Sequence, residues 1–112
     1  MDNKQKKYYL WILGCQMNIA DAERIRTILN SINYLETNIE KDADVIITIA
    51  CSVKQSGIDR IFGKSKNWKK RKNLITILTG CVVKEDKPKM EKIFNHLINI
   101  HEINKLPRLL NI

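Results

Sequence analysis

Three short apolar runs, each followed within two residues by a cysteine, limit the possible folds of this chain more than any other feature. The runs occupy residues 8–13, 45–49 and 74–79. They are rich in Ile, Leu, Val, Tyr and Thr, which is typical of buried strands. Amphipathic segments of helix length separate the runs. The sequence therefore predicts parallel strands joined by helical crossovers.

The helical segments show an apolar face and recognisable end signals. Asn18 is a candidate N-cap for the first helix, and Ser52 for the second. Pro88 suits the first turn of a third helix. The inner faces of the second and third helices are predicted to consist of Ile58, Ile61, Phe62 and Trp68, and of Met90, Ile93, Phe94 and Leu97. The predicted fold is α/β, an open, mostly parallel sheet of four or five strands with helices on both faces, of the flavodoxin/Rossmann-like type.

Length and composition predict a single intracellular domain. The 112 residues are the usual length of one domain. No apolar stretch approaches the ~18 residues that a membrane-spanning helix needs. The charged start, residues 1–7, leads into a strand too short for a secretory signal, so a cytoplasmic location is expected. In a reducing compartment, three cysteines argue for metal binding or reactive thiols rather than disulfides.

The three cysteines share one sequence context. The pairs Gly14-Cys15, Ala50-Cys51 and Gly80-Cys81 each follow an apolar run. A single free cysteine is usually a small buried hydrophobe. However, the carboxyl ends of parallel strands line one edge of a sheet, where ligands bind. The shared context therefore favours one common site for Cys15, Cys51 and Cys81.

The ligand count at such a site favours iron and sulfide over zinc. A structural zinc site usually has four protein ligands. The only histidines, His96 and His101, are not expected in the loops that follow the strands. Three thiolates without a fourth ligand suit an iron–sulfur cube with one open iron. A structural three-cysteine metal site stays open as the alternative.

The chain is basic, with a formal charge of +8 at pH 7 and a pI near 9.5. Basic surfaces attract nucleic acid through phosphate contacts. A solvated helix end explains such a run equally well. A non-enzymatic, basic RNA-binding α/β module is thus a second possible function. The main basic run consists of Lys64, Lys66, Lys69, Lys70, Arg71 and Lys72.

The residues around the cysteines resemble the methylthiotransferase family of radical S-adenosylmethionine enzymes. The first motif is Gly14-Cys15-Gln16-Met17-Asn18, and its Gln-Met-Asn form is typical of the branch that acts on tRNA. The second motif is the run Ala50-Cys51-Ser52-Val53-Lys54, and the third is Thr79-Gly80-Cys81. The closing segment, residues 105–110, is similar to the end of that family's N-terminal domain. Residues 1–112 are therefore identified as one such N-terminal domain.

The resemblance implies a cofactor, a substrate and a partner domain. Cys15, Cys51 and Cys81 would bind an auxiliary 4Fe–4S cluster that holds the sulfur donor. The full enzyme would use S-adenosylmethionine to methylthiolate N6-isopentenyladenosine-37 in the tRNA anticodon loop. The radical domain's CxxxCxxC motif and the RNA-binding domain are absent from this chain. We therefore expect no catalytic acid, base or nucleophile here, and no activity from this chain alone.

Some positions depart from the family pattern. Ile49-Ala50 stands where the family usually has Asn-Thr, and Lys54 stands in place of a common Arg. Lys84-Glu85 replaces a Gln-Arg pair after the third cysteine. These changes concern hydrogen bonds near the cluster and leave the three thiols in place.

Overall fold

The computed structural model describes residues 6–13, 17–50, 55–80 and 87–110. Within these ranges, five strands form one sheet in the order β2-β1-β3-β4-β5, and all neighbours are parallel. The predicted open parallel sheet is confirmed, and the order 2-1-3-4-5 is the flavodoxin-like one. The strands are Lys7–Leu13 (β1), Leu35–Glu36 (β2), Val45–Ala50 (β3), Ile75–Gly80 (β4) and His96–Leu97 (β5).

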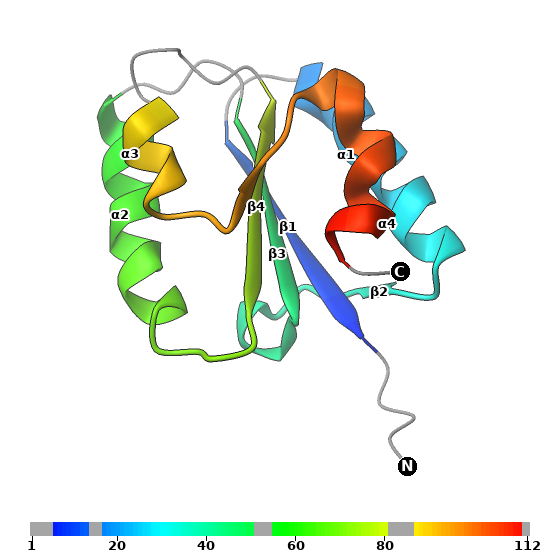
Figure 1. Cartoon of the computed structure of the whole chain (residues 1–112), viewed down its shortest axis with the longest axis horizontal. Coiled ribbons are helices and arrows are strands. Elements are labelled where there is room, and N and C mark those ends of the chain that lie inside the picture. The colour runs from blue at the N-terminus through cyan, green and yellow to red at the C-terminus, as the bar shows by residue number, and fades with distance from the viewer. Residues whose placement is uncertain (1–5, 14–16, 51–54, 81–86, 111–112) are drawn as a thin grey trace.

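Helices cover both faces of the sheet (Figure 1). The helix α1 (Met17–Ser31) lies on one face, together with the 3-10 helix η3 (Ile100–Lys105) and α4 (Leu106–Leu109). The helices α2 (Gln55–Trp68) and α3 (Lys87–Glu91) lie on the other face. Another 3-10 helix, η1 (Glu40–Asp42), precedes β3. This is the three-layer arrangement that parallel crossovers produce.

The central strand β3 supplies side chains to two separate cores. All six of its residues are buried, as expected for a strand covered on both faces. Ile47 and Ile49 pack with Ile25 and Leu29 of α1 on one face. Ile46 belongs to the cluster on the opposite face. That second cluster contains Trp11, Ile61, Trp68, Leu78, Met90 and Phe94.

Several local predictions were wrong. The helix α1 begins at Met17, so Asn18 lies inside the helix instead of capping it. Phe62 is 40% exposed rather than on the inner face of α2, because the buried face there consists of Ile61 and Trp68. The third helix ends at Glu91, and Phe94 is buried from the turn that follows. Leu97 belongs to β5, and Ser52 lies outside the described residues.

None of the helices in the described ranges is long and apolar enough to cross a membrane.

Candidate functional site

The carboxyl ends of three strands lie side by side. Leu13, the last residue of β1, is the Cα partner of Ala50 at the end of β3. Ala50 is in turn the partner of Gly80 at the end of β4. Parallel strands stand about 4.8 Å apart, so Leu13 and Gly80 are separated by about two strand spacings, or roughly 10 Å. We call this row of strand ends the carboxyl edge.

The carboxyl edge is the part of the sheet that precedes all three cysteines in the chain. Cys51 directly follows Ala50, Cys81 directly follows Gly80, and Cys15 comes two residues after Leu13. The three cysteines themselves lie outside the described residues. The structure therefore brings together the residues from which the loops with Cys15, Cys51 and Cys81 start.

The described residues at the carboxyl edge are mostly buried. Leu13 is buried and Ala50 is completely buried. Thr79, one residue before the end of β4, is also buried. Its Oγ1 has no hydrogen-bond partner within the described part of the chain. The described strand ends are therefore packed within the protein.

The strand order also places a topological switch at this edge. The chain runs from β1 outward to β2, and from β3 in the opposite direction through β4 to β5. The helices that follow β1 and β3 in the chain, α1 and α2, lie on opposite faces of the sheet, as at a topological switch point. Ligands in open α/β folds bind at such a point. Cys15 and Cys51 belong to the two loops that follow these strands.

The two histidines lie in β5 and in η3, the helix that follows β5. His96 pairs with Ile77, which lies three residues before Gly80 in β4. His101 is exposed within η3. Among the residues that the structure describes, no three His, Cys, Asp or Glu side chains are grouped closely enough to hold a metal ion. That Cys15, Cys51 and Cys81 are the ligands stays a prediction.

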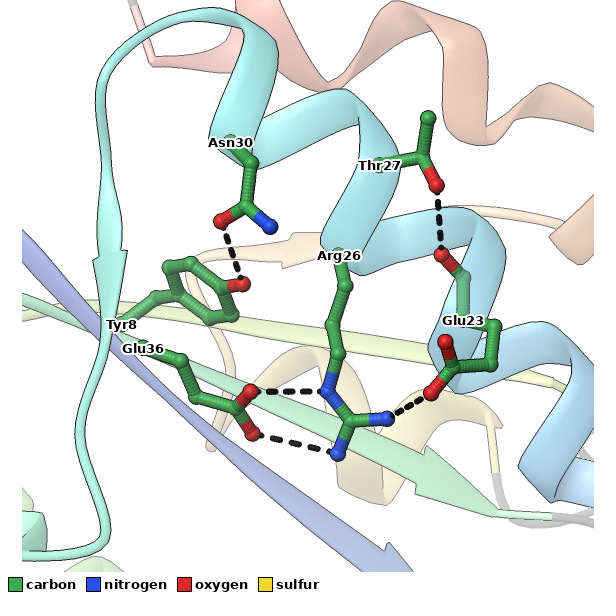
Figure 2. Close-up of polar contacts among 6 residues, drawn as sticks. All are labelled: Tyr8, Glu23, Arg26, Thr27, Asn30 and Glu36. Carbon is green, nitrogen blue, oxygen red and sulfur yellow. Dashed lines mark hydrogen bonds and ion pairs between the residues drawn. The ribbon is translucent and has the colours of Figure 1, made fainter.

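A polar cluster joins α1 to the edge strand β2, and the sequence analysis missed it. Figure 2 shows Arg26 between two carboxylates. Its Nε and Nη2 donate to the two carboxylate oxygens of Glu36, at 2.8 and 3.1 Å, and its Nη1 donates to Glu23. The i,i+3 spacing of Glu23 and Arg26 is readable in the sequence. The contact with Glu36 is not, because it depends on where β2 pairs.

Tyr8 belongs to the same region, directly under α1 (Figure 2). Its hydroxyl donates to Oδ1 of Asn30 at 3.0 Å. The ring is completely buried. Burial, and next the negative charge of Glu36, raises the pKa of Tyr8 to about 12. This tyrosine therefore stays neutral at physiological pH and serves as a structural hydrogen-bond donor.

On the opposite face, cations stack on a tryptophan. The Lys64 Nζ lies 4.8 Å and the Arg60 Cζ 5.7 Å from the ring centre of Trp11. Lys64 also pairs with Glu40, which accepts a 3.0 Å hydrogen bond from Trp68 Nε1. Part of the basic run is therefore used within the fold. Cation–π and ion-pair contacts of this kind hold α2 against the sheet.

Comparison with known proteins assigns the chain to a family. The model of the family described as "Uncharacterized protein family UPF0004" matches residues 7–100. A tRNA-2-methylthio-N(6)-dimethylallyladenosine synthase from Dictyoglomus thermophilum is 31% identical over 111 residues. Synthases of the same name from Citrifermentans bemidjiense and Carboxydothermus hydrogenoformans are each 34% identical, over 111 and 115 residues.

The matches cover nearly all of this chain but only part of the relatives. They include 93%, 93% and 95% of this chain, and 25%, 25% and 26% of the respective relatives. The chain thus spans about a quarter of the length of these curated proteins. The chain belongs to the UPF0004 family, and the predicted resemblance of the chain to methylthiotransferases is confirmed.

Proposed function

We propose that this chain is the auxiliary cluster-binding domain of a tRNA methylthiotransferase, with Cys15, Cys51 and Cys81 as the ligands of a 4Fe–4S cluster. The observation that supports this proposal best is the register at the carboxyl edge. Leu13, Ala50 and Gly80 are neighbours there, although they are far apart in the sequence. Three loops that each contain one cysteine thus start from adjacent positions.

Three cysteine thiolates are a suitable set of ligands for an iron–sulfur cluster. Cysteine thiolates are the usual ligands of iron–sulfur clusters, and three of them leave one iron of a cube open. Such an open iron supplies a coordination position for the sulfur that is transferred. Leu13 and Ala50, which precede two of the cysteines, are buried. Hydrophobic residues around a cluster affect its reduction potential.

The reaction itself belongs to the longer enzyme. Relatives that bear the synthase name are about four times as long as the matched segment. We propose that the remaining part supplies S-adenosylmethionine binding, radical generation and further tRNA contacts. This domain would present the sulfur to the adenosine in the anticodon loop. A cytoplasmic location follows from that substrate.

Anaerobic reconstitution of the chain with iron and sulfide tests the proposal. We expect about four irons and four sulfides per chain, as one cubane requires. The Cys15→Ala variant should lose most of this iron. Ile12→Ala is the matched control, because Ile12 lies near the end of β1, the strand that precedes Cys15, and is 37% exposed. This control should keep the full iron content.

Three outcomes would contradict the proposal. Wild-type protein that stays free of iron under these conditions excludes a cluster assembled by this chain. One tightly bound zinc per chain, lost in Cys15→Ala, would instead identify a structural three-cysteine site. Iron that persists equally in Cys15→Ala, Cys51→Ala and Cys81→Ala would show adventitious binding.

A further inference from the structure

A second candidate site lies at the other end of β4. An open hollow of about 280 Å³ is formed by the turn after α2, the start of β4 and the segment after α3. Its polar lining residues are Lys69, Arg71, Lys72, Thr76, Lys92 and Asn95. We call this site the basic hollow. It is separate from the carboxyl edge, since Thr76 comes four residues before Gly80.

Four positively charged side chains line the basic hollow, and no carboxylate does so among the residues that the structure describes. Lys69, Lys72 and Lys92 are exposed, and none of them forms an ion pair within the described ranges. Glu91 lines a neighbouring hollow with Phe94, Asn95 and Leu97. Like charges repel, and an anion bound among them relieves that repulsion.

Arg71 adds charge to the hollow because its partners are neutral. Its Nη1 and Nη2 donate to the backbone carbonyl oxygens of Glu40 and Ala43, at 3.2 and 2.5 Å. These bonds fix the guanidinium beside η1 without cancelling its charge. Glu40 uses its carboxylate for Lys64 and Trp68 instead. The fold therefore holds one cation in place at the wall of the hollow.

The side-chain amide of Asn95 contributes a hydrogen-bond donor, because its contacts identify which of its two terminal atoms is the oxygen. The backbone N–H of Thr76 lies 2.8 Å from Asn95 Oδ1, and an N–H can only donate, so this atom must be the oxygen. The Thr76 hydroxyl also contacts Oδ1, at 3.2 Å. The Nδ2 group of Asn95 has no partner within the described ranges. A group of lysines with a free amide N–H₂ suits a ligand that offers only acceptor oxygens, such as a phosphate.

The openness of the site favours a polymer over a small molecule. Small-molecule pockets enclose most of the ligand and are largely apolar. Here three lysines are solvent-exposed, and Lys66 and Lys70 nearby are exposed as well. Thr76 and Gly80 are about 13 Å apart at 3.3 Å per residue. Successive phosphates of one nucleic acid strand advance about 3.4 Å along the helix axis. A few nucleotides therefore span the distance between the hollow and the carboxyl edge.

We propose that the basic hollow binds backbone phosphates of an RNA whose modified base is at the carboxyl edge. The identity of this RNA as a tRNA rests on the proposed function. The phosphate contacts rest on the charges and donors of the hollow alone. Binding through phosphates would be independent of the RNA sequence and would weaken with salt.

The test measures binding of the full 112-residue chain, without cluster, to a fluorescein-labelled anticodon stem-loop RNA by anisotropy. The probe variant is Lys72→Gln/Lys92→Gln. The matched control is Lys6→Gln/Lys105→Gln, which removes the same charge from exposed positions beside β2 and in η3. Circular dichroism melting checks that both variants stay folded. Arg71 is left intact because it also bonds to η1.

We expect the probe variant to bind about tenfold or more weakly at about 0.1 M salt, and the control to change less than about twofold. The slope of log K against log salt should fall by about two in the probe variant, or about one for each lysine. Equal weakening in both variants would mean a diffuse charge effect and overturn the proposal, as would wild-type protein without RNA affinity.

Competition separates RNA from smaller phosphates. Inorganic phosphate or adenosine triphosphate at concentrations near that of the RNA should not displace it. Displacement at those concentrations would mean a nucleotide-sized site and would also overturn the proposal. The readout does not depend on iron. A chain that binds RNA but no iron would refute the proposed function alone, and a chain that binds iron but not RNA would refute this inference alone.

Discussion

The two faces of the sheet are covered in different ways. On one face, α1, η3 and α4 contact one another as well as the strands. Their core is mainly aliphatic, with Ile25, Leu29, Ile103 and Leu106 all completely buried. On the other face, aromatic rings link α2 to its neighbours. Trp68 packs edge-on against Trp11 at 6.2 Å between ring centres, and it lies 5.5 Å from Phe94.

This difference concerns how the packing energy is distributed. The aliphatic face divides it among many side chains of similar size, so each one contributes a moderate share. The aromatic face depends on Trp68, which joins the end of α2 to β1, to Phe94 and, through Glu40, to η1. Large rings dominate the energy of the cores in which they occur. The aromatic face should therefore tolerate a single truncation less well.

The largest expected effect tests that contrast directly. Trp68→Ala should lower the free energy of unfolding by about 3–5 kcal/mol, since it removes the ring contacts and leaves a cavity. Leu106→Ala on the aliphatic face should cost less, about 2–3 kcal/mol. Urea denaturation measures both. A larger loss for Leu106→Ala would contradict the proposed contrast. Trp68→Phe should show an intermediate loss, because it keeps a ring but removes the bond to Glu40.

The next effect concerns the ion pairs on the aliphatic side. Arg26→Gln should cost about 1–2 kcal/mol, because Arg26 makes a two-point contact with Glu36. Arg24→Gln is the matched control on the same helix, where Arg24 is exposed and lies 4.0 Å from Asp21. The control should change stability by less than about 0.5 kcal/mol. If salt at about 1 M does not reduce the difference between the variants, the effect is not electrostatic.

A smaller effect should appear at alkaline pH. The pKa of Tyr8 in the folded chain is about 12, above the usual 10, so folding favours the neutral phenol. This contribution is complete below pH 10 and is lost as the pH rises toward 12. Tyr8→Phe should cost about 1 kcal/mol at pH 7 through the lost bond to Asn30.

The same variant should weaken the alkaline loss of stability. Urea midpoints at about pH 9 and pH 11 measure it, and absorbance of the tyrosinate follows the ionisation itself. Burial, and then the charge of Asp44, also raises the pKa of Tyr34, so part of the loss should remain. An unchanged pH dependence in Tyr8→Phe would show that Tyr8 does not cause it.

The smallest expected effect has the opposite sign. Thr48 in β3 is completely buried, and its Oγ1 has no hydrogen-bond partner in the described ranges. Thr48→Val should therefore raise stability by about 0.5–1 kcal/mol. Thr76→Val is the matched control, because the Thr76 hydroxyl bonds with Asn95. The control should lose about 1 kcal/mol in the same urea titration. A loss in Thr48→Val as well would point to a partner for that hydroxyl.

The sequence predicted the strands well because their pattern is local. The apolar run at residues 45–49 became Val45–Ala50, one residue longer. The short edge strands are harder to find: β2 has two residues, both exposed, and no run of apolar residues marks it. The prediction of which side chains face the core was wrong where two apolar residues are adjacent in a helix. Phe62 has the apolar character of a core residue, yet it is 40% exposed because its neighbour Ile61 takes the buried position.

The position of the candidate site in the sheet was also predictable from the sequence. The context of the three cysteines indicated a common edge, and the pairing of Leu13, Ala50 and Gly80 agrees with this. Whether Cys15, Cys51 and Cys81 share one cluster stays a prediction. The basic hollow could only be half foreseen. Lys69 and Lys72 belong to a basic run that is visible in the sequence. Lys92 and Asn95 come from a distant segment, which the fold places beside that run.

The pairing of β1, β3 and β4 also has a consequence for biosynthesis. Each pair joins residues far apart in the sequence, and β3 hydrogen-bonds to both of its neighbours. At about 5–20 residues per second, roughly 3–13 s pass between the synthesis of Leu13 and that of Gly80. The ribosome therefore releases the first thiol well before the edge beside it exists. The register of the three strand ends is therefore complete only after β4 has been synthesised.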